Sequence, residues 1–203
     1  MDVRQRRSQE RLHAAVLRLA TDGPVTDLSV TAVATAAGVH RSTFYEHAAS
    51  PADLLQAALV AELDELRAGL FDGLLGGDAA DTPQAVRQVT LDVLRHVERH
   101  AAIYRRGLGA GSGSGSLHAM LSGHFRATSL RLLELARLEV RVAVPGVPDQ
   151  IVADLAARFI ADGTVGIIEG WLAGDLGVDD VLETYAALLP TWWPSHMGEP
   201  LGG

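Results

Sequence analysis

The stretch from Ser29 to His47 constrains the fold more than any other part of this chain. Ser29 is a favourable N-cap, and the residues after it place one apolar face at helical spacing: Val30, Val33, Ala34 and Ala37. Gly38 tolerates the left-handed backbone that ends such a helix. Residues 40–47 then predict a second short helix in which Phe44 turns inward. The two helices predict a helix-turn-helix, whose second helix can enter a DNA major groove.

Polar side chains of this second helix are the candidates for reading DNA. Arg41 is the candidate for direct base contact, because a guanidinium can bond both acceptors of guanine. Ser42 and Thr31 are candidates for secondary contacts to bases or sugars. Glu46 could accept a hydrogen bond from cytosine, but an ion pair with Arg41 is the simpler interpretation. His47 could also act as a capping residue at the helix end.

These residues also resemble a known family. The run A-A-G-V-H-R-S-T-F-Y-E-H, with S-V-T-A-V-A before it and S-P-A-D-L-L after it, is similar to the helix-turn-helix signature of TetR-family bacterial transcriptional regulators. The resemblance covers roughly residues 7–59, and beyond it the chain resembles the family only in length and helical character. It implies that Thr43, Tyr45 and His47 position the helix through DNA phosphates.

Two positions depart from the family pattern. Pro51 stands where members often have a lysine, and Ala48 stands where they often have an aromatic or large apolar residue. The first departure removes a usual phosphate contact, and the second thins the small core around the helix-turn-helix.

The net charge of −8 is unfavourable for nucleic-acid binding, but the charge is unevenly distributed. Residues 1–50 hold six arginines and five acidic residues, so they are near +1 and the remainder is near −9. Arg4, Arg6 and Arg7 cluster at the start, where a flexible arm could reach a backbone or minor groove. Arg7 is therefore a further candidate DNA contact. All 17 basic residues are arginine.

Composition excludes several other classes. The chain has no cysteine, so disulfides and thiolate chemistry are excluded. Its first residues lack the apolar core of a signal peptide, and no apolar run approaches the roughly 18–20 residues that cross a bilayer. We therefore expect a soluble cytoplasmic protein without a membrane partner.

Periodicity predicts an all-α fold of about nine helices in two units. Residues 1–49 should form the helix-turn-helix DNA-binding domain, and residues 50–203 an effector-binding and dimerisation domain. Loops are expected at 73–81 and 109–115, and an irregular tail from residue 190. Besides the helix-turn-helix, the expected helices are 8–21, 50–70, 82–100, 103–108, 116–140, 149–172 and one from 179.

The last two helices are candidates for a homodimer interface. Gly163, Gly166 and Gly170 each cost a helix about 1 kcal/mol relative to alanine, so a closely approaching neighbour is expected. Two amphipathic helices can pair with a second copy as a four-helix bundle, as the family resemblance also implies. Alternatively, they complete the core of their own chain.

The resemblance further implies a small apolar or aromatic effector bound among the helices of the larger unit. The candidate wall residues, each of which ordinary core packing would also explain, are Phe71, His96, His100, Tyr104, Phe125 and Trp171.

His96 and His100 stand four residues apart on one helix face, a spacing that can hold a divalent metal. No third ligand is evident in the sequence, so no metal or cofactor is expected. An enzyme is not expected either, although a metal-dependent enzyme built on this histidine pair stays as an alternative.

These inferences predict a sequence-specific transcriptional regulator that binds double-stranded DNA as a homodimer. A two-fold pair of recognition helices about 34–36 Å apart implies a palindromic operator. We expect a repressor that a ligand releases from DNA. The alternative within the same class is an architectural or partner-regulated DNA-binding protein without a small-molecule effector.

Overall fold

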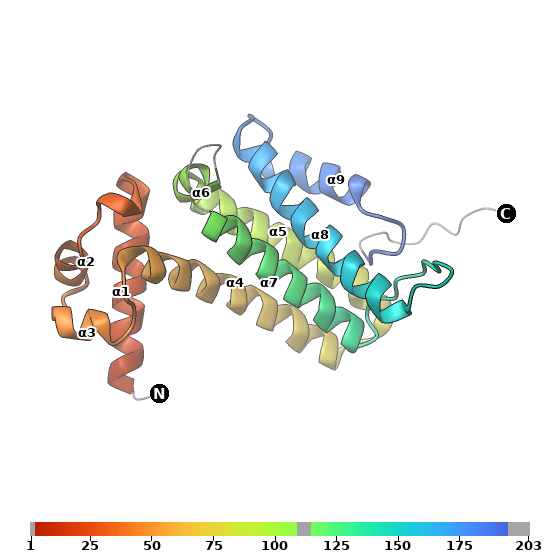
Figure 1. The fold of residues 1–203 in the computed structure, drawn as a ribbon, viewed down its shortest axis with the longest axis horizontal. Helices are drawn as coiled ribbons and strands as arrows, with labels where there is room; N and C mark the ends of the chain where they lie inside the picture. Colours follow the sequence, from red (N-terminus) through yellow and green to blue (C-terminus); the bar gives the residue numbers. More distant parts are fainter. Residues whose placement is uncertain (1–2, 109–114, 195–203) are drawn as a thin grey trace.

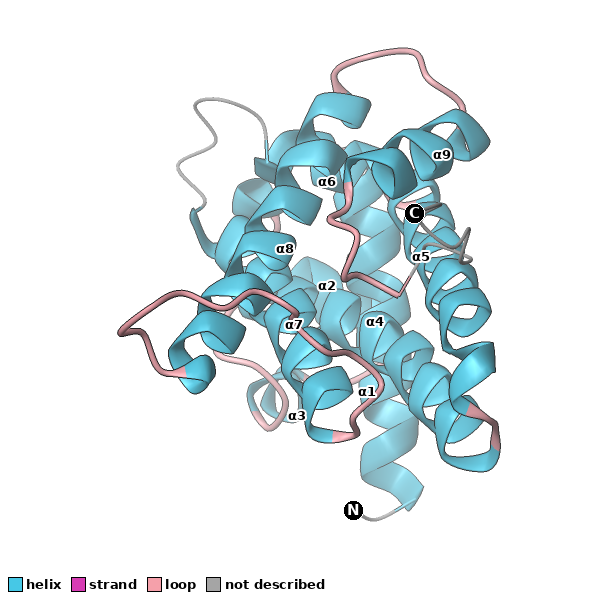
Figure 2. Cartoon of the chain, turned by 90° about the vertical axis from the view of Figure 1, so that its right-hand side faces the viewer, coloured by secondary structure: helices cyan, strands magenta, loops and turns pink. Residues whose placement is uncertain are grey.

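The computed structural model describes residues 3–108 and 115–194. In these ranges the regular elements are nine α-helices and two short 3-10 segments, without a strand (Figure 2). The expected all-α class is therefore confirmed. The glycine-rich segment 109–114 and the last nine residues of the expected tail lie outside the described residues.

The first three helices form a small unit at one end of the molecule, which we call the head (Figure 1). It consists of α1 (Val3–Asp22), α2 (Val30–Ala37) and α3 (Arg41–Tyr45), with a 3-10 segment at Val25–Asp27. The long α4 (Pro51–Gly76) runs from the head into a bundle of helices (Figure 1). After a 3-10 segment at Ala79–Asp81, the bundle continues with α5 (Thr82–Arg99), α6 (Ala101–Leu108), α7 (Gly115–Glu134), α8 (Asp149–Leu172) and α9 (Val178–Leu188).

One hydrophobic core connects the head to the near half of the bundle. Phe44 and Leu12 of the head are fully buried, and the same cluster continues through Leu59 of α4 to Tyr104 of α6 and Val165 of α8. A second cluster fills the far end of the bundle. Because α4 contributes to both clusters, a displacement of α4 would alter the packing at both ends of the molecule.

Two helix boundaries differ from the sequence expectation near the head and at the far end of α4. α1 begins at Val3, so Arg4, Arg6 and Arg7 lie on its first turns and not on a flexible arm. α4 continues to Gly76, and Arg137 caps its last turn by donating hydrogen bonds to the carbonyls of Leu74 and Gly77. The expected loop at 73–81 therefore starts later and is partly a 3-10 turn.

The helix expected at 116–140 ends earlier, at Glu134. Ala136 has a positive φ of 51°, and the Arg137 amide donates to the Leu132 carbonyl at 2.9 Å. These are the features of a left-handed C-terminal cap, which usually carries glycine. An alanine at this position gave no signal in the sequence.

The chain segment after α9 is not uniformly irregular. Trp193 is buried in the second cluster and packs with Trp192 at a ring-centroid distance of 6.2 Å. Part of the expected tail therefore closes the far end of the bundle. None of the described helices combines the length and apolar character needed to cross a bilayer.

Candidate functional site

The turn between α2 and α3 has the geometry of a helix-turn-helix. The Ser29 hydroxyl accepts a hydrogen bond from the Ala32 amide at 3.1 Å and so caps α2. Gly38 adopts φ 65° and ψ 37°, and the Val39 amide donates to the Ala34 carbonyl at 3.0 Å. The left-handed glycine ends α2 and turns the chain directly into α3.

Helix α3 is anchored by one residue and otherwise faces outward. Phe44 is 0% exposed, whereas Arg41 and Ser42 are exposed and Tyr45 is 54% exposed. Thr43 lies at the edge, partly buried. A short helix with a single apolar anchor therefore presents three predicted DNA contacts on one outer surface.

The remaining predicted DNA contacts lie close to this surface in different environments. Thr31 is exposed near the start of α2, and Arg7 is exposed on α1. His47 is partly buried after α3, and its Nε2 atom is buried without a hydrogen-bond partner.

Arg41 has no counter-charge among the described residues. No ion pair or hydrogen bond joins its guanidinium to Glu46 or to any other part of the chain that the structure describes. The pairing expected with Glu46 is therefore not observed. The guanidinium is available to an external acceptor.

A groove of about 840 Å³ separates the start of α1 from the turn and α3. Its walls carry the cationic side chains of Arg4, Arg7 and Arg11 on one side and Thr43, Glu46 and His47 on the other, so three arginines face one carboxylate. Phosphate groups favour such positively charged, hydrogen-bonding surfaces. The groove extends the outer surface of α3 toward α1.

The two departures from the family pattern have local structural roles. Ser50 caps α4 by accepting from the Asp53 amide at 3.1 Å, and Pro51 occupies the first position of the helix, where no amide donor is needed. Ala48 packs against the common core as a partly buried residue. The structure therefore explains Pro51 as a helix start.

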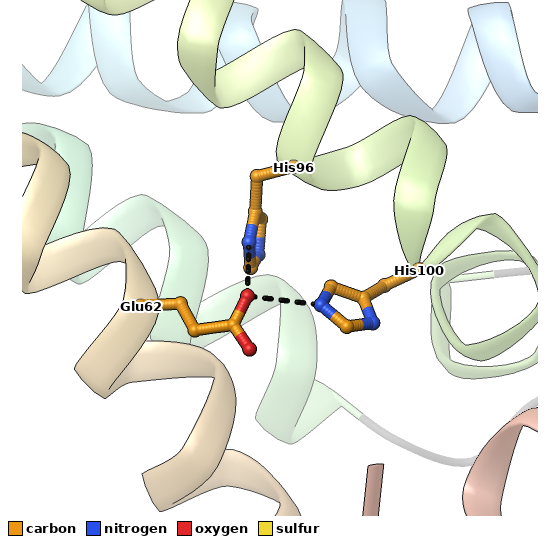
Figure 3. A group of neighbouring side chains, drawn as sticks. All are labelled: Glu62, His96 and His100. Carbon is orange, nitrogen blue, oxygen red and sulfur yellow. Dashed lines mark hydrogen bonds and ion pairs between the residues drawn. The ribbon is translucent and has the colours of Figure 1, made fainter. Parts of the chain in front are cut away.

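A second polar site lies between α4 and α5 (Figure 3). One carboxylate oxygen of Glu62 lies 3.1 Å from His96 Nδ1 and 2.9 Å from His100 Nε2. His96 Nε2 lies 2.8 Å from the Tyr104 hydroxyl. His96 is 1% exposed and Tyr104 is fully buried, so these groups form a hydrogen-bonded cluster at the base of the bundle.

Burial and neighbouring charges shift the pKa values in this cluster. Burial lowers the pKa of His96, and the charge of His100 lowers it further, while Glu62 opposes both. Burial is the largest single influence on Glu62 and would raise its pKa, but the hydrogen bonds and charges of His100 and His96 together lower that pKa below its usual value. Burial also lowers the pKa of His13 on α1, and the charges of His47 and Glu62 act on it in opposite directions. The negative charge of Glu62 on α4 therefore influences the pKa of a histidine in the head.

The bundle also contains a partly open apolar cavity of about 70 Å³. Helices α4, α5, α7, α8 and α9 supply its walls, which include Leu63, Val89, Phe125, Ile160 and Tyr185. Polar groups enter this wall from Arg67, His124 and Thr164. The lining, apolar with a few polar groups, resembles that of small-molecule sites, but the volume is well below the roughly 300–1,000 Å³ of such sites.

Two titratable groups of the cavity wall have shifted pKa values. Burial lowers the pKa of His124 to about 4, and the charge of Arg67 contributes in the same direction. Burial raises the pKa of Tyr185 to about 12, against the effect of its hydrogen bond with Thr164. Both side chains are therefore neutral near pH 7.

The structure does not bring the six predicted effector residues together. Phe125 lies on the cavity wall, whereas His96, His100 and Tyr104 form the separate cluster. Phe71 packs against the core at the far end of the bundle. Trp171 donates a hydrogen bond from its Nε1 atom to the Leu176 carbonyl at 2.8 Å near the end of α8.

Glu62, the third member of the histidine cluster, has no distinguishing signal in the sequence. It lies 34 residues before His96 and has the ordinary sequence context of an exposed helical acid. Only the packing of α4 against α5 brings the two together. The polar cavity residues His124 and Thr164 gave no sequence signal for the same reason.

An apolar surface runs along the outer face of α8. Ile151, Leu155 and Phe159 are 49%, 60% and 68% exposed. The same face continues through Gly163 and Gly166, where an added Cβ would meet no atom within 4 Å apart from the helix's own backbone. No neighbouring helix among the described residues therefore accounts for these glycines.

Comparison with known proteins shows similarity at the level of structure. No protein-family model matches the sequence, and no curated protein matches it. A TetR transcriptional regulator from Rhodococcus sp. RHA1 is 20% identical, with a TM-score of 0.58 and coverage of 90% of this chain and 93% of that chain. FadR from Thermus thermophilus, a TetR-family repressor solved with lauroyl-CoA, is 17% identical, with a TM-score of 0.59 and coverage of 96% and 100%.

RolR in complex with resorcinol is 16% identical, with a TM-score of 0.54 and coverage of 94% of this chain and 98% of that chain. These similarities extend from the head through the bundle. They confirm, for the fold, the resemblance first seen in the helix-turn-helix sequence. The chain has the fold of the TetR-family transcriptional regulators.

Proposed function

We propose that the protein is a sequence-specific DNA-binding transcriptional regulator that acts as a homodimer. The observation that carries this proposal is the outer surface of α3, where Arg41, which has no ion-pair partner in the described ranges, stands beside exposed Ser42 and Tyr45. A helix held by one buried phenylalanine and turned outward in this way fits a DNA major groove.

The head offers separate groups for base contact and for phosphate contact. Arg41, Ser42 and Thr31 would read base edges or sugars, and Thr43, Tyr45 and His47 would hold the helix on the phosphates. Arg7 and its neighbours on α1 line the basic groove next to α3. The near-neutral head would approach DNA while the acidic bundle stays away from it.

We place the dimer interface on α8 and α9. A second copy of the exposed face would cover Ile151, Leu155 and Phe159, and the glycines would let the two helices approach closely. A two-fold dimer would present two copies of α3 to successive major grooves. The operator would then be palindromic, with half-sites about 34–36 Å apart.

We propose that a small apolar or aromatic effector enters the bundle cavity. Two structures with this fold were solved with ligands, RolR with resorcinol and FadR with lauroyl-CoA. The cavity of about 70 Å³ is smaller than the roughly 150 Å³ that holds benzene in an engineered protein. An effector would therefore have to push its walls apart.

Leu63 and Arg67 of α4 belong to these walls, so expansion would displace the helix that carries the head. The resulting change in spacing of the two α3 helices would release the dimer from its operator. A ligand acts in this way only if it binds the displaced state more tightly. Repression relieved by the ligand follows from this arrangement.

The small cavity volume also favours a second candidate, a DNA-binding protein controlled by a protein partner without an effector. A melting-temperature screen with resorcinol, fatty acids and other apolar compounds separates the two. A ligand that binds the native state raises the melting temperature by mass action. A screen without any such shift would favour the second candidate.

The DNA proposal is tested by Arg41→Ala. Fluorescence anisotropy with the promoter of its own gene and with an unrelated duplex, over a range of salt, measures both specific and nonspecific affinity. We expect a loss of about 1–3 kcal/mol in discrimination. Arg141→Ala, which removes the same charge from an exposed bundle site, is the matched control. An equal loss on both duplexes would show that Arg41 contacts phosphate only.

A further inference from the structure

We propose that Glu62, His96 and His100 form a binding site for one divalent transition-metal ion of the zinc class. The three side chains come from two helices, with Glu62 on α4 and both histidines at the end of α5 (Figure 3). Their ligand atoms all lie within 4.8 Å of one another.

The spacing of these atoms fits a metal after small movements. Zinc holds nitrogen and oxygen ligands at roughly 2.0–2.2 Å in a tetrahedral arrangement, which places neighbouring ligand atoms about 3.3 Å apart. Glu62 Oε2 lies 3.1 Å from His96 Nδ1 and 2.9 Å from His100 Nε2. An ion could thus replace the hydrogen bonds without rearrangement of either helix.

The surroundings of His96 suit a ligand role. Its Nε2 atom lies 2.8 Å from the Tyr104 hydroxyl, which is fully buried. A tyrosine hydroxyl can donate or accept, so it can satisfy Nε2 whether that atom carries the proton or not. When Nε2–H donates to Tyr104, the Nδ1 lone pair is free for the metal, as in many protein metal sites.

The donor set selects the class of ion. Two imidazole nitrogens and one carboxylate suit zinc, cobalt, nickel, copper or iron, whereas magnesium and calcium prefer oxygen ligands. The Glu62 side chain is 32% exposed, so an ion can enter from solvent and keep a water ligand. The Arg99 guanidinium lies 3.5 Å from Glu62 and is 64% exposed, so it can move aside.

The position of the site gives the ion a regulatory role, a consequence that rests on the proposed DNA-binding function. His100 is followed directly by α6, whose Arg106 donates hydrogen bonds to the carbonyls of Ala20 and Thr21 at the end of α1. An ion bound by Glu62, His96 and His100 would therefore link α4 to the start of α6, the helix that contacts α1 of the head. We expect this link to change the affinity for operator DNA.

The site is tested by titrating the tag-free, chelator-treated full chain with Co²⁺ by visible absorption and with Zn²⁺ by calorimetry. We expect one ion per chain, with no competition from Mg²⁺. Loss of supporting groups around metal ligands weakens binding by about 10–100-fold, and we expect Tyr104→Phe to fall in this range. Glu62→Gln, which removes a ligand itself, should weaken binding by at least as much.

His118→Gln is the matched control, because His118 forms a similar pair with Glu169 at 3.0 Å but has no third ligand nearby in the described chain. Its affinity for Co²⁺ should equal that of the original protein. Thermal melting of each variant without metal verifies that it is folded. Absence of stoichiometric binding, or equal binding by folded Glu62→Gln, would overturn the site and leave a hydrogen-bonded cluster.

Operator binding with and without Zn²⁺ tests the regulatory role. A Zn²⁺-dependent change of affinity that Glu62→Gln abolishes supports it, and an unchanged affinity with the ion bound refutes it. If no duplex binds under any condition, the proposed DNA function is wrong, whereas the metal titration still decides the site. The two failures are thereby distinguishable.

Discussion

The outer faces of α3 and α8 are both exposed, but they differ in chemistry. The face of α3 presents Arg41 and Ser42 around a single buried anchor, whereas that of α8 presents Leu155 and Phe159 beside a row of glycines. Polar groups lose little by facing water, while an apolar patch of this kind is usually covered by another protein surface. This difference matches the two partners that we propose, DNA at the face of α3 and a second copy of the chain at the face of α8.

The largest effect should come from the anchor of α3. Phe44→Ala removes a fully buried side chain, and such substitutions cost about 3–5 kcal/mol. We expect a large loss in the free energy of unfolding, measured with urea, together with loss of operator binding. Alanine in place of the neighbouring, exposed Tyr45 tests whether the buried and exposed faces of α3 differ as described.

Tyr45→Ala is that control. Its ring is 54% exposed, so we expect a change in unfolding free energy within about 0.5 kcal/mol. Its affinity for DNA should nevertheless fall. If Tyr45→Ala destabilised the protein as much as Phe44→Ala, the outer surface of α3 would be part of the core and not a DNA-binding surface.

The next effect concerns the apolar face of α8. Phe159→Asp places a charge on the residue that is 68% exposed in the single chain. If a second copy covers this face, the substitution buries an unpaired charge at a central contact, and dimerisation should weaken by about 2 kcal/mol or more. Analytical ultracentrifugation over a range of concentrations measures this change.

Val142→Asp makes the same substitution at an exposed loop position and should leave the dimer intact. A Phe159→Asp protein that remained dimeric would place the interface elsewhere. The monomeric variant should also lose cooperative binding to a palindromic operator, because each copy would then contact a single half-site.

Buried His124 should make the stability of the folded protein depend on pH. The pKa of His124 is about 4 in the folded chain and about 6.5 when exposed, because burial disfavours its charged form. Between these values the unfolded chain binds a proton that the folded chain does not, so acidification favours unfolding. We expect stability to be highest above pH 6.5 and to fall as the pH drops toward 4.

His124→Gln should reduce this dependence, as measured by urea unfolding at several pH values between 4 and 7. It should not abolish the dependence, because burial also lowers the pKa of His96. If the unfolding free energy of His124→Gln depended on pH as strongly as that of the original protein, His124 would be charged in the folded protein or already neutral when unfolded.

Local sequence signals predicted the helix-turn-helix of the head, although not the helical start of α1, and they did not predict the sites of the bundle. Ser29 and Gly38 act through neighbours a few residues away, so their spacing predicted the turn, and the position of Phe44 among polar residues predicted the exposed surface. Glu62 meets His96 only because α4 packs against α5, and such a contact between distant helices leaves no periodic pattern. The cavity walls come from five helices and were unpredictable for the same reason.

The ends of the helices could likewise be predicted from the sequence only where a local signal marks them. The glycine at position 38 marked the end of α2, but Ala136 ends α7 in a left-handed conformation that alanine seldom adopts. Arg137 secures that end through hydrogen bonds to the carbonyls of α4, which are more than 50 residues away. Tertiary contacts therefore overrode the local preference for a longer helix.

The smallest effects come from two serines with the same role in the two regions. Ser29 caps α2 by accepting from Ala32 at 3.1 Å, and Ser50 caps α4 by accepting from Asp53 at 3.1 Å. Replacing either by alanine should cost about 1 kcal/mol. Because one hydrophobic core joins the head to the bundle, each variant should unfold in a single transition with a similar shift.

Circular dichroism and Trp fluorescence can follow these two variants together. The tryptophans lie at positions 171, 192 and 193, so fluorescence reports the bundle, whereas circular dichroism also reports the head. Coincident curves for Ser29→Ala would support the continuous core. If circular dichroism showed an earlier loss of helix in Ser29→Ala alone, the head would unfold separately, and the boundary expected near residue 49 would be a boundary of folding as well as of function.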